Sequence, residues 1–410
     1  MKCRFCQTVL KEIFIDLFNS PASNSFLTVE QLNEPELFYP LKVYTCHECF
    51  LVQVDEYKKS DTIFDSSYVY FSSYSSSWLE HARDYVEKMT KRFSLNDKSQ
   101  VVEVASNDGY LLQYFVKKSI PVLGIEPTSN TAEVAKTKGI ESVIDFFGVR
   151  LAKDLTGQDK KADLLLGNNV LAHVPDIVDF TKGLKILLNK EGVVTMEFPH
   201  LVQLIENNQF DTIYHEHFSY LSFTTVKKIF EAAGLVMFDV EEIPTHGGSL
   251  RIYAKHQEDN SKGISANVAT LLEKENQKGI TAINYYRGFQ QQALKVKLSV
   301  LDFLGDQKRG GKKVAAYGAA AKGNTLLNYC GVKTDLIDFV VDANPHKQNK
   351  FLPGSHIPVV NEQYLKEQKP DFVIIFPWNI KEEVKAQLSY IKEWDGKFVI
   401  AIPQFNISIQ

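Results

Sequence analysis

Four cysteines near the start of the chain form two pairs, Cys3/Cys6 and Cys46/Cys49. Each pair has C-x-x-C spacing, which places two thiolates on one turn so that both reach a single ion. Two such turns supply the four-sulfur shell that zinc prefers in structural sites. Because no position is left for a reacting water, we expect one structural zinc per chain, which stabilises the fold and performs no chemistry. Two disulfides are the alternative, which a reducing cytosol disfavours.

A second concentration of reactive groups lies in the segment Tyr214-His-Glu-His-Phe-Ser-Tyr220. Its His-Glu-His core lacks the H-E-x-x-H spacing of zinc proteases, so we expect no catalytic metal there. A histidine beside a carboxylate is typical of proton transfer near neutral pH. The alternative is a purely structural loop whose histidines donate hydrogen bonds to backbone carbonyls.

The elements that position these groups follow from the pattern after Gln100, where short apolar segments alternate with amphipathic ones. This alternation is typical of an α/β fold with a parallel sheet and helices on both faces. We predict strands at Val101–Ala105, Val122–Glu126, Leu164–Gly167 and Val193–Phe198. Ligands of such sheets lie beyond the carboxyl ends of the strands.

Polar residues follow several of these strands. Glu126 ends the second strand about twenty residues after a glycine turn, where a carboxylate can accept hydrogen bonds from both ribose hydroxyls of an adenosine. A G-x-G-x-x-G fingerprint is absent, since the turn retains only Gly109, and this counts against a dinucleotide. We predict that the nucleotide end of a methyl donor is bound by Glu103, Ser106, Asn107, Asp108, Gly109, Glu126, Pro127, Asp145, Phe146, Asn168 and Asn169.

The glycine turn within Thr245-His-Gly-Gly-Ser-Leu-Arg251 offers His246 and Arg251 to an anionic ligand. It is equally consistent with an ordinary hairpin turn. Upstream, Tyr68, Tyr70 and Tyr74 carry apolar rings with polar tips, which suit either a wall over a sugar or a packed domain junction.

A second strand-turn-helix unit begins at Val314 and includes the turn from Gly318 to Asn324. Its small residues bring a helix N-terminus close to a phosphate, and Lys322 adds a positive charge. Another strand ends at Asp342. This arrangement fits a nucleoside diphosphate. The alternative is a nicotinamide dinucleotide, which is disfavoured because the alanines at 319 to 321 crowd the turn.

An apolar stripe at helical spacing predicts a long helix from Tyr285 to Leu304 that bridges two domains. Farther along, Trp378 follows a predicted strand at Phe372–Phe376 and could stack on a base or cap the sheet.

Length and composition exclude several classes of protein. The 410 residues exceed one ordinary core, so we expect two or three domains. A net charge of -4 argues against nucleic acid as the main partner. No apolar run is long enough to span a membrane, and the first residues lack the apolar segment of a secretory signal, so we expect a cytoplasmic protein.

Five motifs in a fixed order resemble those of S-adenosylmethionine-dependent deoxysugar C-methyltransferases, which methylate C3 of nucleotide-linked 4-keto sugars. The motifs are the two cysteine pairs, the Glu-Val-Ala-Ser-Asn-Asp-Gly turn, Asn169 with His173, Tyr-His-Glu-His-Phe-Ser-Tyr, and His-Gly-Gly-Ser-Leu-Arg. The resemblance spans essentially the whole chain. It implies a zinc-binding module at 1–65, a class I methyltransferase Rossmann-like domain at 66–255, and a helical bridge with a second Rossmann-like domain at 256–410 that binds the sugar nucleotide.

The resemblance also implies roles for individual residues. His217 would be the general base that forms an enolate, and the site would be lined by Tyr214, Glu216, His173 and Tyr68 or Tyr70. The substrate would be held by Arg251, His246, Gly318, Lys322, Asn324 and Asp342, and its nucleotide would be dTDP. We expect a monomer or a weak homodimer. The remaining alternatives are an O- or N-methyltransferase, an NAD-dependent sugar-nucleotide enzyme and a zinc-ribbon protein that modifies RNA.

Overall fold

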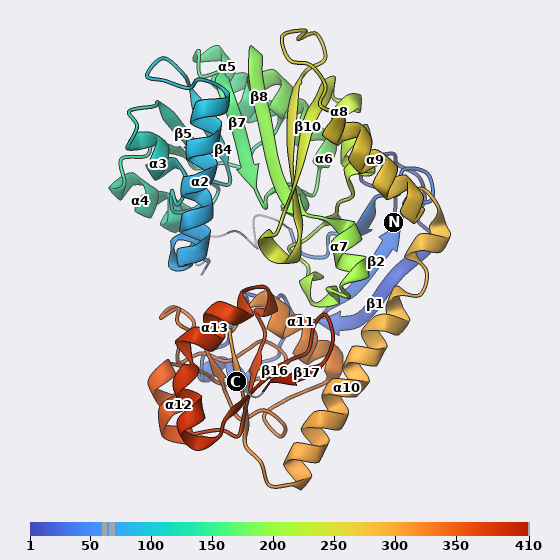
Figure 1. Ribbon diagram of the computed structural model, residues 1–410, viewed down its shortest axis with the longest axis vertical. Coiled ribbons are helices and arrows are strands. Elements are labelled where there is room, and N and C mark those ends of the chain that lie inside the picture. Colours follow the sequence, from blue (N-terminus) through green and yellow to red (C-terminus); the bar gives the residue numbers. More distant parts are fainter. Residues whose placement is uncertain (60–63, 65–69, 409–410) are drawn as a thin grey trace.

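The computed structural model describes residues 1–59, 64 and 70–408. The described chain contains three β-sheets, of four, seven and six strands. Figure 1 shows the two larger sheets one above the other, with the small N-terminal sheet beside the junction between them. The three parts of the chain therefore meet at one place.

The N-terminal sheet contains β1 (Glu12–Ser20), β2 (Tyr39–Thr45) and β3 (Val52–Val54) in antiparallel order. Its fourth strand, β9 (Ser219–Tyr220), comes from the middle of the chain and pairs with β3. The Val54 N–H also donates to the Phe218 carbonyl at 3.1 Å. The pairing of β9 with β3 joins segments more than 160 residues apart and was not predicted from the sequence.

The central sheet has the order β10-β11-β8-β7-β4-β5-β6, and only β11 runs antiparallel to its neighbours. Its strands are β4 (Val101–Val104), β5 (Val122–Ile125), β6 (Ser142–Val143), β7 (Ala162–Asn168), β8 (Leu188–Pro199), β10 (Leu235–Ile243) and β11 (Ser249–His256). All four predicted strands are confirmed within a few residues. β4 ends one residue earlier than predicted because Ala105 has a positive φ of 57°. This is the sheet of a class I methyltransferase.

Helices cover both faces of this sheet because successive side chains of a strand point to opposite sides. Val101 packs with α2 and α3, whereas Val102 packs with α5 and α6. The helices of this domain are α2 (Ser76–Arg92), α3 (Leu112–Val116), α4 (Ser129–Thr137), α5 (Val149–Gly157), α6 (Ile177–Leu187), α7 (Leu201–Glu206), α8 (Phe223–Ala232) and α9 (Ala266–Lys278). Short 3-10 turns at Leu171–His173, Phe210–Thr212 and Thr245–Gly247 border the junction with the C-terminal domain.

The C-terminal sheet has the order β14-β13-β12-β15-β16-β17, with β17 alone antiparallel. The strands are β12 (Val314–Tyr317), β13 (Val340–Val341), β14 (Val359–Val360), β15 (Phe372–Ile375), β16 (Lys397–Ile400) and β17 (Asn406–Ser408), and the helices are α11 (Ala321–Cys330), α12 (Glu362–Gln368) and α13 (Lys381–Gln387). This is a second doubly wound domain, and the predicted strand-turn-helix unit from β12 to α11 is confirmed. Across the described residues, no helix combines the length and apolarity needed to cross a bilayer.

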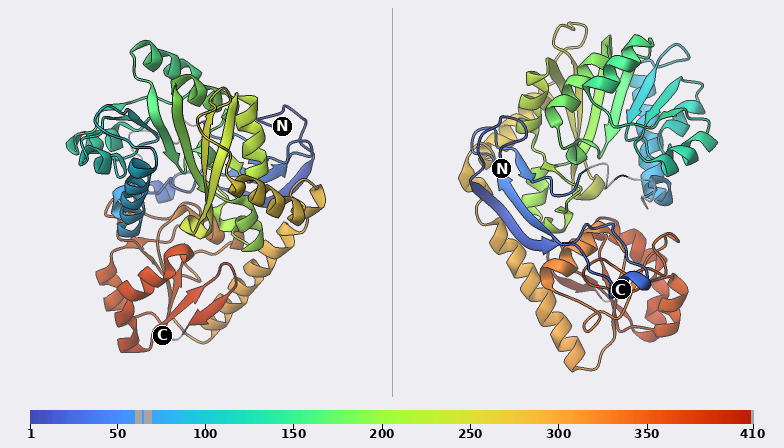
Figure 2. Two further views of the ribbon diagram at one scale, coloured as in Figure 1. Left: turned by 45° about the horizontal axis from the view of Figure 1, so that its top comes forward. Right: turned by 180° about the vertical axis from the view of Figure 1, so that it is seen from behind.

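The bridging helix α10 (Phe289–Arg309) begins four residues later than predicted, because Gly288 has a positive φ of 90° and Ile283–Tyr286 forms a separate 3-10 turn. It runs from the central domain along the C-terminal domain (Figure 2). The predicted apolar stripe is buried, including Phe289 and Leu304.

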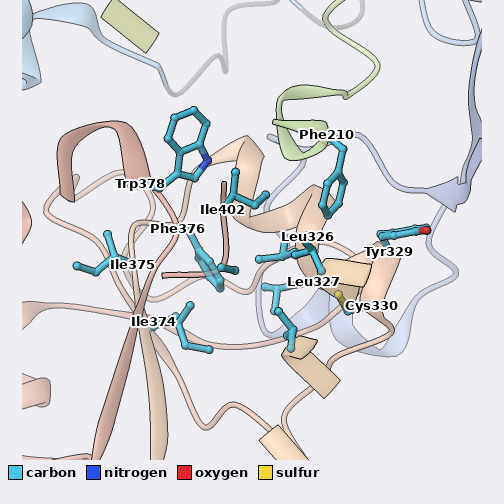
Figure 3. Packing of buried hydrophobic residues seen from close by; sticks show 14 of the residues in the cluster. Phe210, Leu326, Leu327, Tyr329, Cys330, Ile374, Ile375, Phe376, Trp378 and Ile402 are labelled. Atoms are coloured by element: carbon cyan, nitrogen blue, oxygen red, sulfur yellow. The ribbon is translucent and has the colours of Figure 1, made fainter. Parts of the chain in front are cut away.

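One apolar core connects all three parts of the chain. Phe14 of β1 stacks on Phe289 of α10 with ring centroids 4.7 Å apart. Phe210 of the central domain lies edge-on to Tyr329 of α11 at 5.4 Å, and Figure 3 shows it beside the core of the C-terminal domain. The domains are thus joined by buried packing as well as by the chain.

We expect Phe289→Ala to lower the free energy of unfolding by about 3–5 kcal/mol, because it leaves a cavity against Phe14 and removes the apolar contact of a fully buried ring. Urea unfolding followed by circular dichroism measures this change. Leu298→Ala on the same helix is the matched control, since Leu298 is 51% exposed and its truncation should alter stability by less than ~0.5 kcal/mol. Equal effects of the two variants would contradict the packing role of Phe289.

Candidate active site

A cavity of about 1140 Å³ lies where the carboxyl ends of the central strands face the C-terminal domain. Cavities that hold one drug-sized ligand measure ~300–1,000 Å³, so this cavity has room for two ligands. All three parts of the chain contribute to its wall. Among the predicted site residues, those that line it are Tyr70, Asn107, Glu126, Pro127, Asp145, Phe146, Asn168, Asn169, His173, Tyr214, Glu216, His217, His246 and Lys322.

Glu126 occupies the end of β5 and is 4% exposed. One carboxylate oxygen accepts the Asn107 N–H at 2.8 Å, and the other accepts the Thr128 N–H at 2.9 Å. Burial raises the pKa of Glu126, and these donors oppose the rise. The Glu126 carboxylate therefore fixes the turn after β4 and also faces the cavity.

Several buried polar atoms around this turn have no hydrogen-bond partner within the described residues. They include both carboxylate oxygens of Glu103, Ser106 Oγ, Asp108 Oδ1, Asn168 Nδ2 and Asn169 Oδ1. Each such atom costs about 1–3 kcal/mol unless a ligand satisfies it. Of these residues, only Asn168 and Asn169 line the cavity. Together with Glu126, whose carboxylate suits the ribose of S-adenosylmethionine, they fit that cofactor.

The opposite wall carries a histidine with a defined tautomer. His217 Nδ1 lies 2.8 Å from the Thr212 carbonyl oxygen, which can only accept, so Nδ1 carries the proton. The lone pair of Nε2 then accepts a hydrogen bond from the Tyr214 hydroxyl at 2.9 Å. The ring of His173 lies edge-on to His217 with centroids 4.6 Å apart. A neutral imidazole with a cavity-facing lone pair can act as a base.

Burial keeps the histidines of this wall uncharged. It lowers the pKa of His217 well below its ordinary value, with His173 as a second cause. It also lowers the pKa of His173 and of His246 to about 4. Burial raises the pKa of Tyr214 well above its usual range, so this hydroxyl remains a proton donor.

At the C-terminal wall, Lys322 lies over the indole of Trp378 at 4.3 Å and donates to Asn379 at 2.7 Å. Burial lowers the pKa of Lys322 to about 8, against the opposing charge of Asp211. The Trp378 indole N–H donates to Asp211 at 2.7 Å. Because this ring is buried beneath Lys322, it joins the two domains and is not available to stack on a base.

The other predicted site residues lie outside the cavity lining. Arg251 is 4% exposed and forms an ion pair with Glu197 at 2.9 Å. Asn324 donates to the Ser23 carbonyl, and Asp342 accepts the Ala319 N–H at 2.7 Å. Glu103, Ser106, Asp108, Gly109 and Gly318 also lie outside it, and Tyr68 falls outside the described residues.

The sequence analysis assigned no site role to His81, Asn24 or Lys347, which all line the cavity. His81 on α2 bonds Glu197 at 2.9 Å. Glu197 in turn accepts the Thr245 hydroxyl at 2.8 Å, beside the turn that carries His246. Nothing in the sequence links His81 to β8, because Glu197 lies 116 residues later in the chain.

The sulfur atoms of Cys3, Cys6, Cys46 and Cys49 all lie within 4.8 Å of one another. None of the four cysteines forms a disulfide. The shortest sulfur–sulfur distances join one C-x-x-C turn to the other, at 3.5 Å from Cys3 to Cys49 and 3.4 Å from Cys6 to Cys46. This four-sulfur cluster fits one tetrahedral zinc.

Comparisons with known proteins agree with this division of the chain. Residues 3–64 match a family described as "Putative zinc binding domain", residues 78–240 a "Methyltransferase domain", and residues 244–403 a "C-methyltransferase C-terminal domain". The chain is 32% identical over 403 residues to C-methyltransferase NovU of Streptomyces niveus, covering 98% of this chain and 96% of that protein.

Solved structures of methyltransferases show a weaker likeness to part of this chain. An S-adenosylmethionine-dependent methyltransferase of Clostridium acetobutylicum is 10% identical, covers 43% of this chain and 92% of its own, and gives a TM-score of 0.35. The CcbJ methyltransferase of Streptomyces caelestis is 11% identical, covers 43% and 89%, and gives 0.34.

Removing zinc should loosen the segment that carries His217, because β9 pairs with a strand that starts just after Cys49. Hydrogen exchange followed by mass spectrometry should show faster exchange at 52–54 and 217–220 after chelation, and about one zinc per chain should be released. Peptides from α12, which is remote from β3, are the internal control. Unchanged exchange at 217–220 in fully zinc-free protein would contradict this dependence.

Glu126→Ala should weaken S-adenosylmethionine binding by about 1–3 kcal/mol, since the ribose hydroxyls lose their acceptor. Isothermal titration calorimetry measures the change. Glu133→Ala on the following helix is the control. Glu133 is exposed and does not line the cavity, so this substitution removes the same charge without changing the cavity wall. An unaltered affinity in Glu126→Ala would show that the donor lies elsewhere.

Proposed function

This chain belongs to the S-adenosylmethionine-dependent C-methyltransferases with an N-terminal zinc-binding domain, and from that premise we propose that it methylates C3 of a nucleotide-linked 4-keto deoxysugar. The observation that carries the proposal is the neutral His217, whose Nε2 lone pair faces a cavity large enough for a donor and a second ligand.

The chemistry of the acceptor explains why such a base is needed. Carbon is a poor nucleophile unless a neighbouring carbonyl can accept the charge left by proton removal. In a 4-keto sugar, His217 Nε2 takes the C3 proton, and the electron pair moves onto the C4 oxygen as an enolate. General-base catalysis of this kind contributes ~10²–10⁴-fold to the rate. S-adenosylmethionine, when bound, supplies an electrophilic methyl group.

Tyr214 is suited to stabilise the enolate. Its hydroxyl donates a hydrogen bond to His217 Nε2 at 2.9 Å. When the C3–H bond occupies that position, the hydroxyl can donate to the adjacent C4 oxygen instead. Its raised pKa keeps the proton on the phenol during the reaction. Loss of one such donor typically costs ~10²–10³-fold in rate. His173, Glu216 and Tyr70 complete the wall around the sugar.

The nucleotide part of the substrate belongs at the C-terminal wall. Lys322 and Lys347 line the cavity there, and their charges suit a diphosphate. We assign the nucleotide as dTDP from the family resemblance. Bound diphosphate would also favour protonation of His217 and so strengthen a base that burial alone has weakened. The protein would act in the cytoplasm as a monomer or weak homodimer, without nucleic acid as a partner.

We expect His217→Asn to lose proton removal while it retains both ligands. In deuterated water, with a donor analogue that cannot transfer its methyl group, the unaltered enzyme should exchange the C3 hydrogen of a dTDP-4-keto-deoxysugar. The variant should show at least a ~10²-fold slower exchange because it lacks the general base. Mass spectrometry of the recovered sugar measures the exchange.

His215→Asn is the matched control. His215 lies two residues earlier in the same loop, bonds the Pro40 carbonyl at 3.2 Å and does not line the cavity, so exchange should persist. Exchange that survives in His217→Asn but disappears in His215→Asn would move the base. Methyl transfer only to acceptors without a ketone, or tight binding of a nicotinamide dinucleotide, would refute the proposed reaction.

A further inference from the structure

A residue of the zinc-binding module reaches the cavity and contacts the segment that carries the base. Asn24 lies in the loop after β1, and its side-chain nitrogen is 2.8 and 3.0 Å from the two carboxylate oxygens of Glu216. Asn24 lines the cavity, and Glu216 is 3% exposed. One N–H of this amide lies between the two oxygens as a shared donor, and an ionised carboxylate can only accept, so the contact is strongest when Glu216 is charged.

The position of Asn24 is set by the C-terminal domain. The carbonyl of the preceding Ser23 accepts a hydrogen bond from Asn324 Nδ2 at 2.5 Å. The loop after β1 also packs closely against Gly354 of the C-terminal domain. If Gly354 carried a Cβ atom, that atom would lie only 3.0 Å from Pro21 Cγ. Glu36 adds two contacts, with the Gly354 N–H at 2.8 Å and with His356 at 2.9 Å. Asn24 is therefore held against Glu216 from outside the catalytic segment.

We propose that Asn24 is a positioning residue that holds the Glu216 carboxylate toward the cavity, where it accepts a hydrogen bond from a hydroxyl of the sugar. The role of Glu216 toward the sugar rests on the proposed function, whereas the contact between Asn24 and Glu216 does not. An ionised carboxylate is a stronger acceptor than a protonated one and has no donor of its own. The pair would thus distinguish a sugar that presents a hydroxyl at this wall from one that lacks it.

The electrostatics of the pair agree with this geometry. Burial raises the pKa of Glu216 to about 7, and the Asn24 hydrogen bonds are the largest opposing cause. Lys58, which follows β3, and Lys347 of the C-terminal domain also favour the charged form. Tyr214 in the same segment faces Glu216 and stays neutral. Loss of the Asn24 donor therefore shifts Glu216 further toward its neutral form.

The test measures the titration of Glu216 without substrate. In protein labelled with ¹³C at the glutamate carboxyl carbons, the Glu216 signal is the one lost in Glu216→Gln. Asn24→Ala should raise its apparent pKa by about one pH unit, the equivalent of one charge-assisted hydrogen bond. Asn24→Asp, nearly identical in shape, should raise it at least as far, because a second carboxylate replaces the donors. Asn33→Asp, exposed in the same module, is the control and should not shift the signal.

A second measurement connects the titration to activity. The acidic limb of the kcat/KM profile should move to higher pH in Asn24→Ala by the same amount as the NMR titration. Retained zinc content and donor affinity establish that the variants are folded. A Glu216 signal that titrates unchanged in folded Asn24→Ala or Asn24→Asp would overturn the proposal. An unaltered enzyme that does not methylate keto sugars would instead refute the proposed function, and the NMR result would still stand.

Discussion

The pairing of β9 with β3 is the interaction on which the active site depends. β9 has two residues, too few to form a stable strand without a partner sheet. Pairing with the zinc-binding module fixes the backbone directly after His217. The same module holds the neighbouring loop, since Arg4, next to Cys3, donates to the Pro175 carbonyl at 2.8 Å, two residues after His173. The zinc-binding module thereby contacts both segments that carry histidines of the cavity wall, His173 and His217.

Burial then determines the chemical state of these groups. A buried imidazole gives up its charge readily, because its neutral form still makes two hydrogen bonds. A buried carboxylate keeps its charge better when N–H or O–H groups donate hydrogen bonds to it. The cavity therefore combines neutral histidines with the charged partner Lys322.

Local patterns in the sequence predicted the elements that are defined by a few neighbouring residues. The C-x-x-C pairs, the strands β4, β5, β7 and β8, and the turn before α11 each carry their own signal. Contacts between distant segments carry none. Nothing in a loop rich in Pro, Ser and Asn marks Asn24 as a partner of Glu216, and Arg251 looked available to a ligand because its partner Glu197 lies on a neighbouring strand. The start of α10 was predicted too early because the apolar spacing continues through the 3-10 turn before Gly288.

The shared core has a consequence for how the chain is made. β1 leaves the ribosome early, yet Phe14 finds its stacking partner only in α10, after the whole methyltransferase sheet has been synthesised. At ~5–20 residues per second, the N-terminal module must wait on the order of ten seconds or more with an apolar face exposed. Both C-x-x-C turns lie within the first fifty residues, so they can bind zinc during that interval. Early zinc binding would hold the strands of the N-terminal module in register until α10 has been synthesised. The ion would then act first as a folding template and later as a structural support.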